Sequence, residues 1–264
     1  MKTKYKIIDM HTHIFPDKVA EKAVFNIGNY YNLNMSGKGT VNDLMKSGKQ
    51  IGVEEFVVHS SATSAEQVKA INDYIANTAK KYDNIIGFGT LHPGMKNPGA
   101  EVQRIISLGL KGVKLHPEFQ NFCIDHPSMM PIYASIQGKL PLLIHMGDEK
   151  RDSSSPERLS RVLELFPSLT VIAAHFGGYR MWDDSSRFLL GKNLYMDTSS
   201  SLAFLKPEEA VNMIRIHGAD KFLFGTDYPM WDHEEELNRF LHLNLTEQER
   251  YAILYSNAVR LLNA

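Results

Sequence analysis

The chain has 264 residues, 43% of them hydrophobic, and a formal net charge of −1 at pH 7. This length is short for two full domains, so we predict a single domain over residues 1–264. The balanced charge provides no basic surface for nucleic acid or for an anionic membrane. A single cysteine, Cys123, excludes an intrachain disulfide framework.

The first six residues include three lysines, but no long apolar segment follows them. We therefore predict that the chain has no signal peptide and is cytoplasmic. No apolar run is long enough to span a bilayer. We expect a small-molecule substrate as the partner, with neither nucleic acid nor a membrane. A homodimer is compatible with the sequence, although no feature of it indicates one.

Short β-rich apolar segments alternate with helix-like stretches from end to end. Strands are predicted at residues 6–12, 55–60, 85–91, 111–116, 140–146, 169–175, 193–198 and 221–226. Helices are predicted at residues 40–50, 64–82, 99–108, 129–138, 156–166, 181–190, 207–217 and 232–242. Eight such units predict an α/β fold, a parallel (β/α)8 TIM barrel. A doubly wound open sheet is the alternative from the same pattern.

A further helix is predicted at the C-terminal end, over residues 246–262. It opens with Thr246 three residues before Glu249, the pattern of a capping box. Residues 14–39 are the irregular part of the chain, because the stretch from Asn26 to Gly39 is rich in asparagine, glycine and tyrosine. We predict a long loop there, which either shapes the mouth of a site or covers the barrel edge.

Two histidines, His11 and His13, end the first predicted strand, and Asp9 precedes them by two residues. Side chains two residues apart on a strand point to the same face. Paired imidazoles on one face suit a transition metal such as Zn²⁺. The alternative is a polar strand end with two solvated histidines.

Other polar side chains stand where later strands are predicted to end. They are His59, His92, His116, His145, His175 and Asp227. In a barrel these strand ends share one face, which holds the active site. A carboxylate that closes a buried strand, as Asp227 does, needs a partner, and a metal ion would be one. The alternative for Asp227 is a helix cap or a turn residue.

Five segments in this order resemble the amidohydrolase superfamily, and within it the amidohydrolase-2 group of aminocarboxymuconate-semialdehyde decarboxylase-like enzymes. They are Asp9-Met10-His11-Thr12-His13, Gly112-Val113-Lys114-Leu115-His116-Pro117, His145, Ala174-His175-Phe176-Gly177-Gly178 and Gly225-Thr226-Asp227-Tyr228-Pro229. The resemblance spans the whole chain. It identifies the superfamily better than it identifies the reaction.

The resemblance implies one divalent metal ion, with Zn²⁺ favoured and Mn²⁺ or Fe²⁺ compatible. The implied ligands are His11, His13, His145 and Asp227. Asp227 would also accept a proton from bound water. His175 would be the catalytic histidine that polarises the substrate or orients the water, whereas in two-metal relatives it is a ligand. A second metal ion held by Lys114 is less favoured. Lys114 shares a face with His116, and the alternative is that its side chain runs outward between helices.

The implied function is that of a metal-dependent hydrolase that uses a metal-activated water on a small cyclic amide, lactone or ester. The alternative is a metal-dependent non-oxidative decarboxylase, a carboxy-lyase of a small unsaturated or aromatic acid. Candidate substrate contacts are His116, Arg151 and Tyr228. A non-enzymatic barrel is disfavoured by the intact set of site residues. A metal-dependent nuclease is disfavoured because the fourth strand ends in His116 and not in an acidic residue.

Overall fold

The computed structural model describes residues 4–263, so residues 1–3 of the basic N-terminal stretch and residue 264 lie outside the described part. The chain divides into two compact units. Unit 1 combines the residues up to Val58 with those from Thr198 onward, and unit 2 is residues 59–197. Within residues 4–263, no helix combines the length and the apolar composition that crossing a membrane requires.

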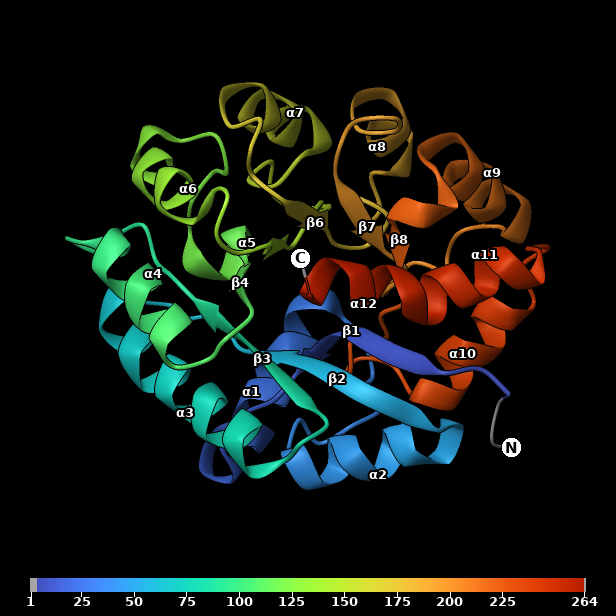
Figure 1. The fold of residues 1–264 in the computed structure, drawn as a ribbon, viewed down its shortest axis with the longest axis horizontal. Coiled ribbons are helices and arrows are strands. Elements are labelled where there is room, and N and C mark those ends of the chain that lie inside the picture. The colour runs from blue at the N-terminus through green and yellow to red at the C-terminus, as the bar shows by residue number, and fades with distance from the viewer. Residues whose placement is uncertain (1–3, 264) are drawn as a thin grey trace. The chain divides into compact units, whose positions relative to one another are not determined.

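All eight predicted strands are present, and their order in the sheet follows their order in the chain. The strands are β1 (Ile7–His13), β2 (Val53–His59), β3 (Ile85–Thr90), β4 (Gly112–Leu115), β5 (Leu142–Ile144), β6 (Val171–Ala173), β7 (Tyr195–Asp197) and β8 (Phe222–Leu223). Helices alternate with them along the chain, as Figure 1 shows. The fold is the predicted (β/α)8 barrel.

The helices lie close to their predicted positions, with two that the sequence did not predict, at residues 17–31 and 117–120. They are α1 (Asp17–Tyr31), α2 (Val41–Ile51), α3 (Val68–Lys81), α4 (Pro98–Ser107), α5 (Pro117–Gln120), α6 (Met130–Ile136), α7 (Pro156–Leu165), α8 (Trp182–Phe188), α9 (Pro207–His217), α10 (His233–Leu241), α11 (Glu247–Tyr251) and α12 (Asn257–Leu262). The capping box of Thr246 and Glu249 is formed at the start of α11. A π-helical turn, Ala252–Ser256, joins α11 to α12.

In unit 2 the strands from β3 to β7 pair in parallel. Val113 of β4 lies opposite Leu142 of β5, and Leu142 lies opposite Val171 of β6. All three side chains are fully buried. Strands buried on both faces read as continuous apolar runs, which is why these short segments could be recognised. Helix α3 packs against β3 (Figure 1).

In unit 1 the first strand pairs with the segment that follows the last one. The amide of Met10 donates to the carbonyl of Phe224 at 2.9 Å, and the amide of Asp227 donates to the carbonyl of His11 at 2.8 Å. Helix α10 packs against α2 outside these strands (Figure 1). The pairing brings the end of β1 and the segment after β8 together, and both segments carry predicted site residues.

The prediction of a loop over residues 14–39 is wrong for its first half, which forms α1. The helix follows Pro16 and ends at Asn32, whose left-handed backbone (φ 53°) lets the N–H of Leu33 donate to the carbonyl of Gly28 at 2.9 Å. Gly28 lowers helix propensity and made the segment resemble a loop. A Cβ atom there would lie 3.0 Å from the Leu33 carbonyl oxygen, so the returning chain packs directly against the helix backbone. Residues 14–16 and 32–40 remain without regular secondary structure.

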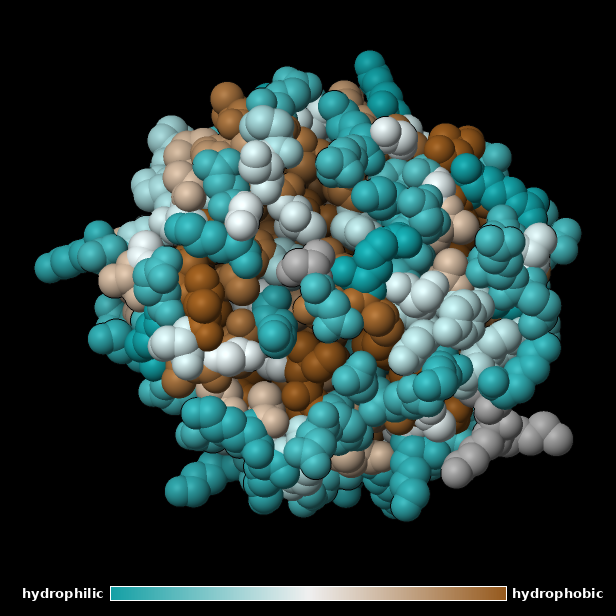
Figure 2. Space-filling model, in the orientation of Figure 1, coloured by the Kyte–Doolittle hydropathy of each residue, from teal (hydrophilic) through white to brown (hydrophobic). Residues whose placement is uncertain are grey.

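On the face shown in Figure 2, hydrophilic side chains cover most of the surface, and apolar ones are visible between them. The large apolar side chains that are exposed lie singly on helices, among them Phe25 of α1, Leu165 of α7 and Ile216 of α9. Scattered exposed apolar residues are normal for a folded protein and mark no interface by themselves.

A network of charges in unit 2 ties the loop after α5 to α7. Asp125 accepts hydrogen bonds from Arg158 at 2.6 Å and from Arg161 at 2.8 Å. Burial alone would raise the pKa of the Asp125 carboxyl, but the hydrogen bonds from Arg161 and Arg158 outweigh it, and the pKa lies below its usual value. A carboxyl whose pKa is lowered by folding stabilises the folded state where it is ionised.

We predict that Asp125→Asn lowers the free energy of unfolding at pH 7 by about 1–2 kcal/mol, because two charge-assisted hydrogen bonds are weakened. The stabilisation by Asp125 is fully present above the ordinary carboxyl pKa and is lost as the pH falls through the lowered one. The difference between variant and parent should therefore shrink below about pH 4 in urea titrations. Asp152→Asn, at a carboxylate that bonds to Arg158 but is mostly exposed, is the control with the smaller expected effect. If the free energy of unfolding of Asp125→Asn differs from that of the parent by a constant amount down to pH 2, this account is contradicted.

Candidate metal centre

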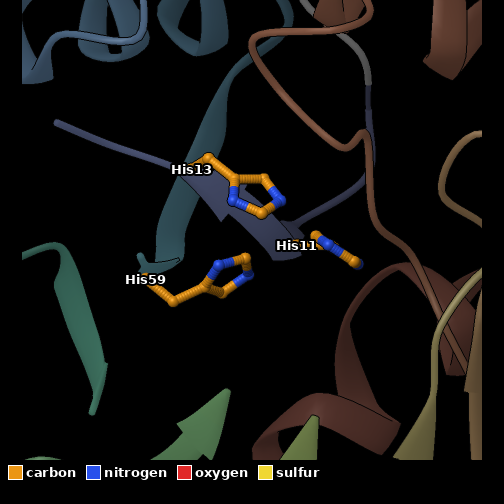
Figure 3. A group of neighbouring side chains, drawn as sticks. All are labelled: His11, His13 and His59. Atoms are coloured by element: carbon orange, nitrogen blue, oxygen red, sulfur yellow. The ribbon is translucent and has the colours of Figure 1, made fainter. Parts of the chain in front are cut away.

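Strand β1 carries the first two candidate ligands on one face. His11 is buried, and the side chain of His13 is 14% exposed. Their ring centroids lie 5.3 Å apart, and Figure 3 shows both imidazoles extending from the same strand. The figure also draws His59, the buried last residue of β2. The strand geometry predicted from the His-x-His spacing is therefore present.

Asp227 joins these two histidines after the end of β8. Its Oδ1 atom lies 3.3 Å from Nε2 of His11 and 3.1 Å from Nε2 of His13. Ligand bonds of about 2.0–2.2 Å place neighbouring donor atoms roughly 3 Å apart around one ion. Each of the two histidine nitrogens therefore has the chemistry and the spacing to share an ion with the Asp227 oxygen. The residues present in unit 1 fit a divalent metal ion.

The backbone at Asp227 is held in an uncommon conformation. Its φ angle is 62°, in the left-handed region that non-glycine residues seldom adopt. The hydrogen bond from its amide to the His11 carbonyl fixes this turn. The carboxylate is thereby directed back towards β1, which explains how residues 216 positions apart in the chain meet.

A second buried carboxylate, Asp9, lies behind the ligands. Its Oδ1 accepts from the amides of His11 and Thr226, both at 3.1 Å, and its Oδ2 accepts from the Thr226 hydroxyl at 2.6 Å. Nε2 of His233 lies 3.2 Å from the same Oδ2, and Nδ1 of His233 is 2.8 Å from the Ser47 hydroxyl. Asp9 thus joins the backbone of β1 to that of the segment after β8. The sequence predicted that Asp9 lies on the same face of the strand as the two ligand histidines. In the structure its carboxylate accepts hydrogen bonds from the backbone next to the ligands.

Unit 2 brings His145 and His175 together after β5 and β6. Nε2 of His175 lies 2.9 Å from Nδ1 of His145, and Nε2 of His145 lies 3.0 Å from the Gly147 carbonyl oxygen. The amide of His175 donates to Oδ1 of Asp197 at 2.9 Å, and φ at His175 is 62°. The two facing nitrogens suit either a hydrogen bond or two ligands of one ion. The ligand role of His145 and the catalytic role of His175 stay predictions.

A third cluster in unit 2 consists of His116, His145 and Glu118. Oε2 of Glu118 lies 3.5 Å from Nδ1 of His116 and 3.9 Å from Nε2 of His145. The two imidazole rings stack 4.0 Å apart with only 11° between their planes. A metal ion lies in the plane of each imidazole that binds it, and no point lies in two parallel planes. This cluster therefore does not fit a single ion held by both histidines.

Glu118 is a buried acid that the sequence did not indicate. Burial raises the pKa of its carboxyl to about 7, against the lowering effect of a hydrogen bond from Ser154. The Ser154 hydroxyl donates to Oε1 at 2.5 Å. The available signal was its position two residues after His116, at the start of α5. Its protonation state changes near neutral pH, next to two imidazoles.

The remaining predicted residues occupy defined places. Lys114 is completely buried in β4, so its side chain does not run outward to solvent. Arg151 bonds to the Glu118 carbonyl at 3.4 Å and to Oδ1 of Asn121 at 3.3 Å. The Tyr228 hydroxyl donates to Asp43 at 2.7 Å, which assigns it a packing role in unit 1. Substrate contact by His116, Arg151 or Tyr228 stays a prediction.

Two serines that the sequence did not single out contact the ligands of unit 1. The Ser199 hydroxyl lies 3.0 Å from Nδ1 of His11, and the Ser200 hydroxyl donates to Oδ2 of Asp227 at 2.5 Å. Both follow the end of β7, the one predicted strand for which no site residue was named. That position in the barrel was the signal that could have found them.

A model of the family described as amidohydrolase matches residues 8–264 of this chain. Among solved structures, an uncharacterised TIM-barrel protein from Bordetella bronchiseptica is 23% identical, with a TM-score of 0.76 and 98% of each chain covered. A 2,6-dihydroxybenzoate decarboxylase from Rhizobium is 18% identical, with a TM-score of 0.73 and coverage of 98% of this chain and 99% of that one.

A third similar structure is 5-carboxyvanillate decarboxylase from Novosphingobium aromaticivorans, complexed with manganese and 4-hydroxy-3-methoxy-5-nitrobenzoic acid. It is 15% identical, with a TM-score of 0.76 and coverage of 99% of this chain and 97% of that one. At these identities the structural similarity establishes a shared fold.

We predict that Asp9→Ala lowers the free energy of unfolding by about 3 kcal/mol, because it leaves two buried amides and a hydroxyl without their acceptor. Denaturant titration of the metal-free protein measures this loss apart from any effect on metal binding. Asp83→Ala, at an exposed position, is the control and should change stability by less than about 0.5 kcal/mol. Equal stabilities of Asp9→Ala and the parent would show that Asp9 does not hold the two segments together.

Proposed function

Because this chain belongs to the amidohydrolase family, we propose that it is a metal-dependent enzyme whose divalent ion is held by His11, His13 and Asp227. The observation that carries the proposal is the approach of Oδ1 of Asp227 to Nε2 of both histidines, at 3.3 and 3.1 Å. A carboxylate that is 1% exposed is stabilised by positive charge close to it. A bound cation would supply it.

His145 and His175 are proposed as further members of the site. Their strands, β5 and β6, end at the face of a (β/α)8 barrel that holds the active site. His145 is proposed as the fourth ligand, and His175 as the residue that orients the substrate. Nδ1 is the nitrogen of His145 that could bind the ion, because its Nε2 lies 3.0 Å from the Gly147 carbonyl oxygen. This Nδ1 faces Nε2 of His175 at 2.9 Å.

Mn²⁺ and Zn²⁺ are the proposed metal ions. Imidazole favours Zn²⁺, whereas carboxylate oxygen is shared with Mn²⁺ sites, so the donor set accepts either ion. The manganese complex of the similar 5-carboxyvanillate decarboxylase supports Mn²⁺. When bound, the ion would act as a Lewis acid that polarises an oxygen atom of the substrate.

We propose that the reaction is the non-oxidative decarboxylation of a small aromatic or unsaturated acid. Similarity over nearly the whole length to two aromatic-acid decarboxylases supports this choice over hydrolysis. The bond between the ring carbon and the carboxylate carbon breaks, CO₂ leaves, and the bonding pair stays on the ring carbon. That carbon then takes one proton. The reaction therefore requires a residue that delivers a proton at this carbon.

Asp227 is proposed to accept this proton from solvent or substrate and to deliver it to the ring carbon. Its carboxylate is buried, with Oδ1 beside the two histidines of β1 and Oδ2 bonded to the Ser200 hydroxyl. Arg151, which bonds only weakly to Glu118 and Asn121 at 3.4 and 3.3 Å, and His116 are proposed to bind the leaving carboxylate. Tyr228 is the less suitable contact, because its hydroxyl is bonded to Asp43.

Hydrolysis of a small cyclic amide, lactone or ester is the second candidate. The description of the matching family as amidohydrolase favours it. The same residues would serve, with Asp227 accepting a proton from water and passing it to the leaving group. The two reactions are distinguished by their products.

We predict that the protein loaded with Mn²⁺ releases CO₂ from hydroxybenzoic acids that carry a hydroxyl group beside the carboxylate. Asp227→Asn should lower this rate by about 10²–10⁴-fold, because the amide cannot deliver the proton. The matched control is Asp232→Asn, on the same segment, where an asparagine side chain can still cap α10 as Asp232 does. CO₂ is measured by coupled assay beside a panel of lactones and cyclic amides. Turnover of that panel without CO₂ release from any acid would favour hydrolysis.

A further inference from the structure

Two consecutive serines, Ser199 and Ser200, each contact a different proposed ligand of the metal ion in unit 1. Ser199 lies 3.0 Å from Nδ1 of His11, and Ser200 lies 2.5 Å from Oδ2 of Asp227. Both serines are fully buried. Neither contact involves the ligand atoms Nε2 of His11 and Oδ1 of Asp227. The serines therefore act on the side of each ligand that faces away from the ion.

The indole of Trp231 completes this arrangement. Its Nε1 lies 2.8 Å from the Ser200 hydroxyl oxygen. An indole N–H can only donate a hydrogen bond, so the Ser200 oxygen must accept from it. The hydroxyl hydrogen of Ser200 is then directed to its other neighbour, Oδ2 of Asp227. The direction of both hydrogen bonds follows from the chemistry of the indole alone.

The indole is itself held from two sides. The ring of Phe204 meets it edge to face at 5.7 Å, and the guanidinium of Arg239 lies 5.0 Å from its centroid. Arg239 is in turn paired with the buried Glu236. Trp231 has little freedom to turn its N–H away from Ser200. The chain from Trp231 through Ser200 to Asp227 is therefore preorganised before any ligand arrives.

We propose that Ser199, Ser200 and Trp231 are positioning residues of the metal centre, an inference that rests on the proposed function. Ser200 keeps Oδ2 of Asp227 occupied as an acceptor, so that Oδ1 is the oxygen presented to the ion. Ser199 accepts the Nδ1 hydrogen of His11, which leaves Nε2 free of a proton and able to bind metal. Partners of this kind orient ligands, and their loss typically weakens metal binding about 10–100-fold.

The backbone conformation of Ser200 allows the effect of losing its hydroxyl to be separated from the effect of backbone strain. Its φ angle is 50°, in the left-handed region. Alanine and glycine both remove the hydroxyl, but only glycine adopts this conformation without strain. Ser200→Ala and Ser200→Gly should therefore differ in thermal stability while they lose the same metal affinity. A purely structural role of Ser200 would make affinity follow stability.

The experiment measures Mn²⁺ affinity by competition with a chelator for the parent protein and five variants. Ser200→Ala and Ser200→Gly should each bind Mn²⁺ about 10–100-fold more weakly, and Trp231→Phe roughly tenfold more weakly. In the Ser200→Ala background, Trp231→Phe should add no further loss, because the indole acts only through the hydroxyl. Thr78→Val removes a buried hydroxyl that donates to the Tyr74 carbonyl and should leave the affinity unchanged.

Three outcomes would overturn the inference. Parent-like affinity in both Ser200 variants would show that the hydroxyl does not position Asp227, while the proposed metal site would stand. If Trp231→Phe weakens Mn²⁺ binding by the same factor in the parent and in the Ser200→Ala background, the indole acts through packing and not through the hydroxyl. A parent protein that binds no Mn²⁺ or Zn²⁺ would remove the proposed function and this inference with it.

Discussion

The burial of one carboxylate, that of Asp227, is the constraint on which the rest of unit 1 depends. A charge withdrawn from water must be compensated nearby, and the groups that meet this carboxylate are His11, His13 and Ser200. The pairing of β1 with the segment after β8 brings them to it, and Asp9 fixes that pairing through backbone amides. Ligand spacing, strand pairing and the left-handed turn at Asp227 therefore form one arrangement.

The alternation of apolar strands and helices could be predicted because each element is marked locally. Buried parallel strands are continuous apolar runs, and helix starts carry signals such as Pro156, Pro207 and the capping box at Thr246. The His-x-His spacing likewise fixes a shared face within a single strand. Each of these inferences needs only neighbouring residues, which is why the eight strands agree with the structure.

Features that depend on distant contacts could not be predicted in the same way. Helix α1 was missed because Gly28 resembles a loop residue, and only the returning backbone at Leu33 explains it. Ser199 and Ser200 are ordinary serines in the sequence and gain their significance from contact with His11 and Asp227. The stack of His116 on His145, which does not fit a shared metal ion, is a matter of ring orientation that spacing cannot reveal.

The most direct test of the central claim is the metal content of the protein, measured by elemental analysis after purification without added metal. The account predicts about one equivalent of a transition metal per chain in the parent, and its loss in a folded His11→Ala/His13→Ala variant. An unchanged metal content in that variant would contradict the assignment of the ligands. A parent that holds no metal and takes up none on reconstitution would contradict the proposed metal centre and leave only the barrel.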